Sequence, residues 1–268
     1  MPAINLAHLK TQVARLADQF NEPETFMRLL NELLEYYTNR TMRLSQVARR
    51  LSLPTHRTPV PVMRQIEREL APLADARPLE GVGLVNFLWE SGSLETRLLA
   101  ARLLGMIPPA QAIPALTRLP EWLAQSTDKL IRQALLTDSF ARLRRENPAA
   151  FFLLLEDWLK SPRSSWQIWG LHALIPLLDD PDFENLPAVF RILRPAIESA
   201  GPSMQTDLQV CLATLARVSM TETVVFMRAI LQENPDAMML RTLRRILPAL
   251  PTELQSDLRD AFRTAEVR

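Results

Sequence analysis

Apolar residues recur along most of this chain at the spacing of an amphipathic helix. In 203–218, for example, Leu208, Leu212 and Leu215 share one face, and 236–250 repeats the pattern. Such spacing places an apolar stripe along one side of a helix with 3.6 residues per turn. The chain has only six glycines, and alternating runs of β-branched residues are few. The sequence therefore predicts an all-α fold.

The predicted helix starts fall into two series with a common period. One series is expected near residues 80, 110, 147, 183 and 220, and the other near 93, 127, 164, 203 and 236. Both recur at about 34–39 residues, which is typical of arrays of two-helix repeats. A single helix pair cannot bury its apolar stripe, so neighbouring pairs stack. We therefore predict a HEAT-like α-solenoid, an α-α superhelix of antiparallel helix pairs.

Local start signals agree with these positions. Three segments have the pattern of a capping box, in which a Ser or Thr precedes a Glu or Gln by three residues: Ser164-x-x-Gln167, Ser219-x-x-Glu222 and Thr252-x-x-Gln255. Prolines stand where a first helical turn is expected, in Asn147-Pro148, Asn234-Pro235 and Leu250-Pro251. We expect a helix to begin at each of these signals.

The first part of the chain has a different character. Residues 36–66 contain no acidic residue and no lysine, and 52–61 is a proline-rich segment that we expect to be a loop. The arginines of this stretch are Arg40, Arg43, Arg49, Arg50, Arg57 and Arg64. We therefore predict an N-terminal cap or subdomain at 1–78 and a repeat array at 79–268.

Arginine dominates the basic residues, although the overall charge is nearly balanced. The chain has 31 basic and 30 acidic residues, and only Lys10, Lys129 and Lys160 are lysine. The bias has two explanations that the sequence leaves open: the codon usage of a GC-rich genome, or a use for the planar guanidinium fork in phosphate binding. A further cluster, Arg241, Arg244 and Arg245, lies where a helix is expected to end and where cations favour the helix dipole.

Several functional classes lack their sequence signatures. A single cysteine, Cys211, cannot form an internal disulfide or a cysteine-rich zinc site, and three scattered histidines do not predict a metal site. We expect neither a signal peptide nor a membrane span, and therefore a cytoplasmic location. The sequence contains neither a glycine-rich phosphate loop nor a nucleophile–base motif, so no motif indicates a cofactor or an enzyme.

Residues 84–104 place Leu88 and Trp89, a short polar turn, Glu95 and an alanine- and leucine-rich helix in succession. This order resembles a segment of the AlkD-like DNA alkylation repair family. The residues that carry the resemblance are Leu88, Trp89, Glu90, Glu95, Arg97 and Ala100. A looser similarity in 156–171 is carried by Trp158, Ser161 and Trp166. The resemblance spans residues 79–230.

The resemblance implies a curved HEAT-like solenoid whose concave face holds duplex DNA. Some family members excise alkylated bases with a tryptophan and an aspartate one helical turn apart, supported by an arginine and a second tryptophan. Ungapped placement puts these positions at Lys129, Gln133, Trp169 and Ala213, so none of the four residue types is matched. Asp128, beside the first position, is the only candidate that the resemblance leaves for catalysis.

Three functions follow as hypotheses. The first is a DNA-binding repeat protein without base-excision chemistry, the second a non-enzymatic scaffold for a protein partner, and the third a divergent glycosylase for alkylated bases. The expected partner is duplex DNA or a protein chain, and we expect no cofactor, metal or membrane. The residues predicted to contact the partner are Arg40, Arg43, Arg49, Arg50, Arg57, Arg97, Arg132, Trp166 and Trp169.

Overall fold

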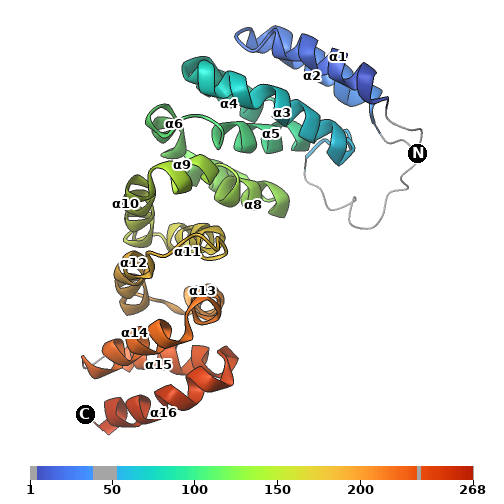
Figure 1. The fold of residues 1–268 in the computed structure, drawn as a ribbon. Helices are drawn as coiled ribbons and strands as arrows, with labels where there is room; N and C mark the ends of the chain where they lie inside the picture. Colours follow the sequence, from blue (N-terminus) through green and yellow to red (C-terminus); the bar gives the residue numbers. More distant parts are fainter. Residues whose placement is uncertain (1–4, 39–52, 234–236, 268) are drawn as a thin grey trace. The chain divides into compact units, whose positions relative to one another are not determined.

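The computed structural model describes residues 5–38, 53–233 and 237–267, and within these ranges the chain forms helices and turns without strands (Figure 1). The predicted all-α helical-repeat fold is therefore confirmed. Four of the predicted partner-binding arginines, Arg40, Arg43, Arg49 and Arg50, lie outside the described residues.

The chain divides into two compact units, unit 1 at Met1–Pro148 and unit 2 at Ala149–Arg268. The boundary predicted at 78/79 falls inside unit 1, where the helices before it pack against those after it. Whether 1–78 behaves as a separate cap stays a prediction.

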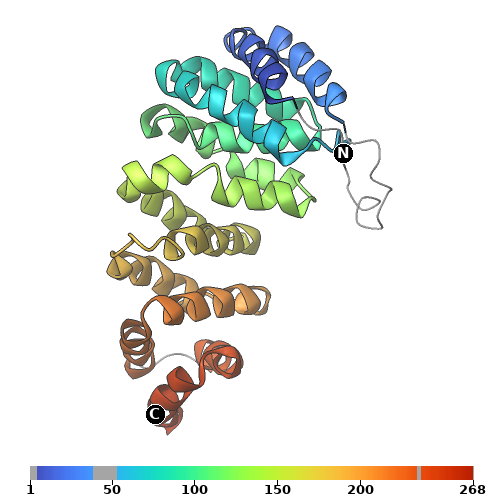
Figure 2. The ribbon, with the colours of Figure 1, turned by 45° about the vertical axis from the view of Figure 1, so that its right-hand side comes forward.

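Unit 1 consists of two layers of helices. One layer contains α1 (Leu6–Ala17), α3 (Val60–Ala76), α5 (Leu94–Leu104) and α8 (Lys129–Thr137), which pack in that order. The other contains α2 (Pro23–Tyr36), α4 (Pro78–Glu90), α6 (Pro109–Leu116) and α9 (Ala141–Glu146), with the short α7 (Leu119–Gln125) before α8. Figures 1 and 2 show the helices of each layer side by side.

Unit 2 has the same two-layer plan. One layer contains α11 (Ser164–Leu178), α13 (Gln205–Val218) and α15 (Ala237–Ile246). The other contains α10 (Pro148–Leu159), α12 (Leu186–Glu198), α14 (Met220–Gln232) and α16 (Thr252–Val267). Short 3-10 turns at Pro202–Met204 and Leu247–Ala249 precede α13 and follow α15. Between α12 and α14, the rings of Phe190 and Phe226 stack with their centroids 4.6 Å apart.

Side-chain contacts between successive helices of a layer recur at the predicted period. Four such pairs are Arg102 with Glu67, 35 residues apart; Arg102 with Asp138, 36 apart; His172 with Asp207, 35 apart; and Arg217 with Asp179, 38 apart. Because each contact joins one helix to its counterpart in the next pair, the interactions between helices repeat as well as the helix starts.

The predicted start signals have mixed outcomes. Ser219 caps α14, and its hydroxyl accepts a hydrogen bond from the backbone N–H of Glu222. The box predicted at Ser164 is wrong, because Ser164 is already the first residue of α11. Arg163 takes the capping position there and makes no side-chain hydrogen bond to the helix.

The core lies between the two layers. Four residues of the predicted stripe of α13, Leu208, Cys211, Leu212 and Leu215, are fully buried, whereas Val218, at the end of the same stripe and of the helix, is 39% exposed. Burial raises the pKa of the Cys211 thiol to about 12, so the side chain is a neutral core group at physiological pH.

Candidate anion-binding interface

The starts of α3, α5 and α8 form one edge of a helix layer in unit 1. The hydroxyl of Thr55, just before α3, donates to Glu95 Oε1 at 2.8 Å, and the N–H of Leu94 donates to Pro54 O at 2.9 Å. Near the opposite ends of α5 and α8, the Ser139 hydroxyl donates to Ala101 O at 3.1 Å. The helices therefore run in the same direction, and their positive dipole ends gather on one side.

Cationic side chains accompany these helix starts. We call the group formed by Arg57, Arg97, Lys129 and Arg132 the cationic edge. Three of its members, Arg57, Arg97 and Arg132, were predicted to bind a partner, and they are the predicted arginines that lie in the described part of the chain. Lys129 is the first residue of α8, and its side chain is exposed. It was not predicted as a contact, because an isolated lysine in the sequence does not indicate which residues lie near it in the fold.

Arg97 is held in place by the helix that precedes it. Its Nε donates to the backbone carbonyl of Trp89 at 3.3 Å, and its guanidinium lies 4.7 Å from the centroid of the Trp89 ring. Trp89 in turn stacks on Trp122, with centroids 4.6 Å apart, and both rings are buried. Burial lowers the pKa of Arg97 from its usual value, but an arginine still remains charged at neutral pH.

Arg132 repeats this arrangement one helix pair later. Arg97 and Arg132 are each the fourth residue of their helix, α5 and α8. The Nε of Arg132 donates to the carbonyl of Ser126 at 2.6 Å, which closes the turn after α7. In both cases a cation satisfies a carbonyl at the end of the preceding helix, and the bond at Nε limits the orientations of the guanidinium fork.

Arg57 reaches the edge through a constrained backbone. It has φ = 53°, in the left-handed region that residues with a side chain seldom adopt. Its N–H donates to Thr55 Oγ1 at 3.1 Å, and the N–H of Thr58 donates to Glu95 Oε1 at 3.4 Å. Together with the bond from the Thr55 hydroxyl to the buried Glu95 carboxylate, these bonds hold the segment before α3 in its strained conformation.

Two carboxylates lie at the same edge, and both have structural roles. Glu95 is buried beneath the segment before α3. Asp128 is the N-cap of α8, where Oδ1 accepts from the N–H of Leu130 at 2.8 Å and of Ile131 at 3.4 Å. Capping accounts for the position of Asp128, the residue that the family resemblance left as a candidate for catalysis.

The two predicted tryptophans belong to α11 of unit 2. Trp169 is buried in the packing of α11, so its ring is not presented for stacking on a base. Trp166 is half-buried, and the guanidinium of Arg163 lies 5.6 Å from its ring centroid. Of the two, Trp166 is therefore the one with an accessible ring.

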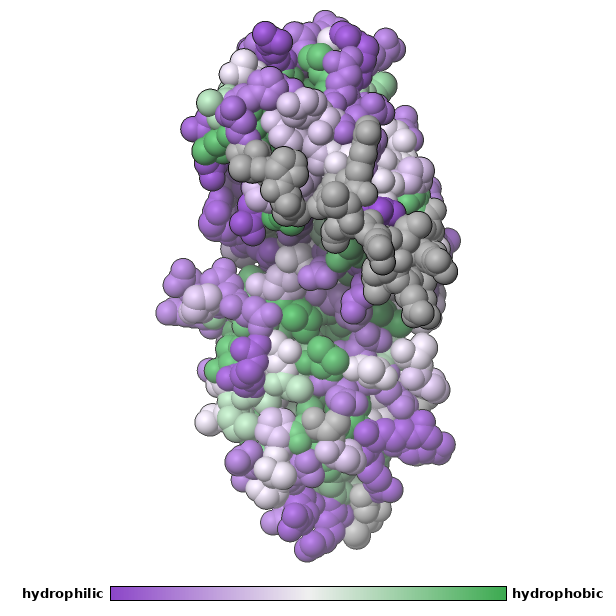
Figure 3. All heavy atoms as spheres, turned by 90° about the vertical axis from the view of Figure 1, so that its right-hand side faces the viewer, coloured by the Kyte–Doolittle hydropathy of each residue, from purple (hydrophilic) through white to green (hydrophobic). Residues whose placement is uncertain are grey.

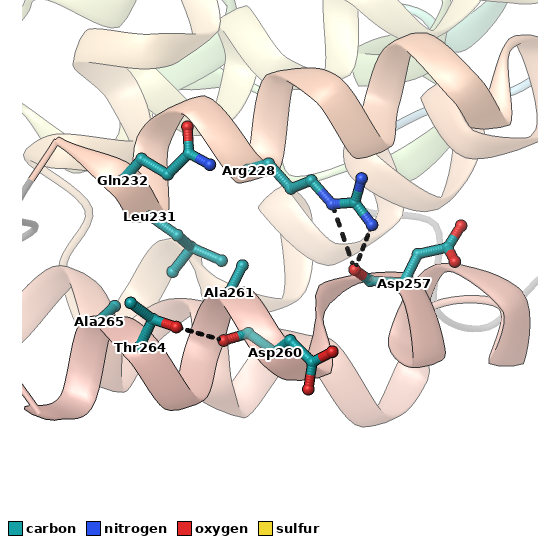
Figure 4. A pocket seen from close by; sticks show the side chains of 8 residues that line it. All are labelled: Arg228, Leu231, Gln232, Asp257, Asp260, Ala261, Thr264 and Ala265. Carbon is teal, nitrogen blue, oxygen red and sulfur yellow. Dashed lines mark hydrogen bonds between the residues drawn. The ribbon is translucent and has the colours of Figure 1, made fainter.

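Unit 2 also contains a pocket of mixed charge between α14 and α16 (Figure 4). It has a volume of about 570 Å³, and Asp257 and Asp260 both line it. Its arginine, Arg228, donates Nε and Nη2 to the backbone oxygen of Asp257 at 3.2 and 2.8 Å. Arg228, the one basic residue among the described residues that line this pocket, is therefore engaged by the protein itself.

A second pocket, between α15 and α16, has a different lining. Its volume is about 320 Å³, and Arg244, Arg259 and Arg263 line it together with Leu247, Gln255 and Phe262. No carboxylate is among these residues. The sequence showed the Arg241–Arg245 cluster but not this site, since Arg259 and Arg263 join Arg244 in one pocket only in the folded chain.

Within 5–38, 53–233 and 237–267, no three His, Cys, Asp or Glu side chains group closely enough to hold a metal ion. None of the described helices combines the length and the apolar character needed to cross a bilayer.

Comparison of the chain with protein-family models, with curated proteins and with solved structures gave no match.

Proposed function

We propose that this chain is a helical-repeat protein that binds duplex DNA through phosphate contacts at the cationic edge of unit 1. The observation that carries the proposal is the repeated arginine geometry of α5 and α8. Arg97 and Arg132 occupy the same helix position and bond the same kind of backbone carbonyl through Nε. Guanidinium groups fixed in this way lose less conformational entropy when they bind phosphate.

The arrangement suits a linear polyanion better than a single small anion. Packed helices lie about 8–10 Å apart, while phosphates along one DNA strand advance by about 3.4 Å each. Adjacent helix starts would then meet roughly every third phosphate of a strand. Contacts of this kind position a protein on DNA without reading the base sequence.

The proposal does not include base excision. Lys129 and Gln133 stand where the resemblance would need a tryptophan and an aspartate, and the Asp128 carboxylate caps α8. The matched residues Trp89, Glu95 and Arg97 are accounted for by packing and hydrogen bonding within unit 1. The proposed function is therefore binding similar to that of the AlkD-like family, without its glycosylase reaction.

Fluorescence anisotropy with a labelled duplex at low ionic strength tests the proposal. We expect the double variant Arg97→Gln/Arg132→Gln to bind about tenfold more weakly, because it loses two phosphate contacts. The matched control is Arg15→Gln/Arg28→Gln, which removes two exposed arginines from α1 and α2 of the same unit and should change affinity by less than about twofold.

Two further measurements make the result decisive. Circular dichroism must show that the variants remain folded, since Arg97 also packs on Trp89. Arg132→Lys keeps the positive charge but loses the guanidinium fork. Because attraction between charges supplies most of a phosphate contact, Arg132→Lys should bind DNA more tightly than Arg132→Gln and almost as tightly as the wild type. The proposal fails if the wild type shows no binding in low salt, or if the control pair weakens binding as much as the edge pair.

A second function, a scaffold for a protein partner, is favoured by the surface of unit 2. Figure 3 shows hydrophobic atoms at the surface over α11 and α13. On α13 the side chain of Val210 is 48% exposed, and Ile168 and Trp166 on α11 are half-buried. On the same face, His172 Nε2 and Asp207 Oδ1 are hydrogen-bonded at 2.6 Å, so these two polar groups are engaged with each other. Such a face suits a partner segment with apolar side chains.

The variant Val210→Asp tests this second function. It should abolish retention of a stoichiometric protein partner in affinity purification, because a charge replaces an apolar contact. Val225→Asp is the matched control, since Val225 is 61% exposed on α14, in the other layer of the same unit. Recovery of the same proteins by the wild type and both variants would exclude the α11–α13 surface as the binding face.

A further inference from the structure

We propose that the pocket between α15 and α16 is a binding site for a phosphate group, held by Arg244, Arg259 and Arg263. The site lies in unit 2 and involves none of the residues of the cationic edge. It is therefore independent of the proposed DNA-binding function.

The helix geometry explains how the three arginines meet. Arg259 and Arg263 are four residues apart on α16, so they lie on the same face one turn from each other. Arg244 stands in the last turn of α15, and the two helices are joined by a short connection. Gln255 Nε2 donates to Leu250 O at 2.8 Å and to Pro248 O at 3.3 Å, which fixes this connection.

The pocket is positively charged because no acidic residue lines it. Arg263 Nη1 lies 3.8 Å from Asp260 Oδ1, and both side chains are largely exposed, so their attraction is weak. Arg259 makes no ion pair within the described part of the chain. Guanidinium groups that line one pocket repel one another, and a bound anion would relieve the repulsion.

The shape and lining indicate which anion fits. Guanidinium forks match the oxygens of phosphate in geometry as well as in charge. Behind them, the buried Phe262 and the half-buried Leu247 offer apolar surface. The volume of about 320 Å³ leaves room beside a phosphate for a small organic group. The same chemistry would accept inorganic phosphate or the phosphate of a monoester.

The neighbouring pocket provides an internal comparison. In Figure 4, the Arg228 guanidinium points at the backbone oxygen of Asp257, and Asp257 and Asp260 are both among the residues that line this pocket. An anion there would find an arginine that is already engaged and two acidic residues in the lining. We therefore expect phosphate to bind between α15 and α16 and not between α14 and α16.

Titration of the full chain with inorganic phosphate at constant ionic strength, followed by NMR of the arginine Nε–Hε groups, tests the site. We expect saturable shifts at Arg259 and Arg263. Arg259→Gln should weaken the affinity about tenfold, as expected for the loss of a charge-assisted contact. The matched control is Arg245→Gln, which removes an exposed arginine from the same last turn of α15 that does not line the pocket, and it should leave the affinity within about twofold.

The same titration is carried out with phenyl phosphate and with phenol. Tighter binding of phenyl phosphate than of inorganic phosphate would identify the site as one for a phosphate monoester, and equal binding would identify it as one for the phosphate alone. Phenol should not compete. The proposal is overturned if the shifts do not saturate, if Arg245→Gln weakens binding as much as Arg259→Gln, or if Arg263→Gln, an exposed second variant, binds like the wild type.

Discussion

Arg102 shows what a single residue contributes to the stacking of unit 1. It lies on α5, where its Nη1 pairs with Glu67 Oε1 of α3 and its Nε donates to Asp138 Oδ2 at the end of α8, at 3.3 Å. One guanidinium thus connects three consecutive helices of a layer. Because the group is partly buried, loss of the arginine would leave carboxylates without a partner, at a cost of about 2 kcal/mol in the free energy of unfolding.

The partner of Arg102 gives a prediction about pH. Burial raises the pKa of Glu67 above its ordinary value of 4.5, and the attraction of Arg102 offsets this only in part. As the pH rises above 4.5, the unfolded chain loses the Glu67 proton before the folded protein does. The contribution of this group to stability therefore falls until the pH has passed the folded-state pKa.

Glu67→Gln removes this titration. We expect the free energy of unfolding of the wild type, relative to that of the variant, to decrease as the pH rises from 4 toward 7. Urea denaturation at a series of pH values measures the difference. A relative stability that increases over this range would mean that the ion pair outweighs the burial of the carboxylate.

Cys211 gives a second prediction at the residue scale. Its thiol is fully buried on α13, and its pKa of about 12 leaves almost no thiolate at pH 8. We expect a disulfide reagent such as Ellman's to leave the native protein unmodified and to titrate one thiol after denaturation. Fast labelling of the native protein would show that α13 opens readily.

At the scale of the helix, most starts were predictable from local signals. The series predicted near 80, 110, 147, 183 and 220 corresponds to α4, α6, α10, α12 and α14, which begin at Pro78, Pro109, Pro148, Leu186 and Met220. Prolines and apolar periodicity mark these places in the sequence itself. The capping box at Ser164 failed, because a Ser-x-x-Gln pattern does not specify which of two adjacent residues adopts the cap conformation.

The close approach of α5 to α8 depends on a glycine. Gly105 ends α5, and a Cβ added there would lie 1.9 Å from the backbone oxygen of Asp138, at the end of α8. Backbone atoms cannot yield as a flexible side chain can, so Gly105→Ala should force α5 and α8 apart. We expect a loss of about 3 kcal/mol in the free energy of unfolding.

Gly83→Ala is the matched control for this prediction. Gly83 lies inside α4, and a Cβ added there meets no atom within 4 Å. Alanine favours a helix over glycine, so this variant should gain about 0.5–1 kcal/mol. Chemical denaturation of both variants measures the contrast, and similar effects of the two substitutions would argue against a tight approach of α5 to α8.

At the scale of the molecule, sequence reasoning could predict the repeat but only part of the candidate sites. The family resemblance pointed to Arg97, but not to its bond to Trp89 O, which depends on how α4 and α5 pack. Arg244, Arg259 and Arg263 line one pocket only because the folded chain brings the end of α15 near one face of α16. The burial of Trp169 is likewise set by neighbouring helices, and a three-residue spacing from Trp166 does not reveal it.

The balanced charge of the whole chain makes the salt dependence of DNA binding a sensitive measurement. With 31 basic and 30 acidic residues, general attraction to DNA is weak, and affinity must come from local contacts. Each neutralised phosphate contributes about −0.9 to the slope of log K against log salt concentration, so the four cations of the edge account for about −3.6.

Removing two of these cations should make that slope shallower by about 1.8, whatever other phosphate contacts the chain makes. The comparison is between the wild type and Arg97→Gln/Arg132→Gln, with affinities measured from 25 to about 200 mM salt. Arg15→Gln/Arg28→Gln should keep the wild-type slope, because α1 and α2 contribute no residue to the cationic edge. An unchanged slope in the edge variant, even with a weaker affinity, would show that Arg97 and Arg132 act on folding or packing and do not contact phosphate.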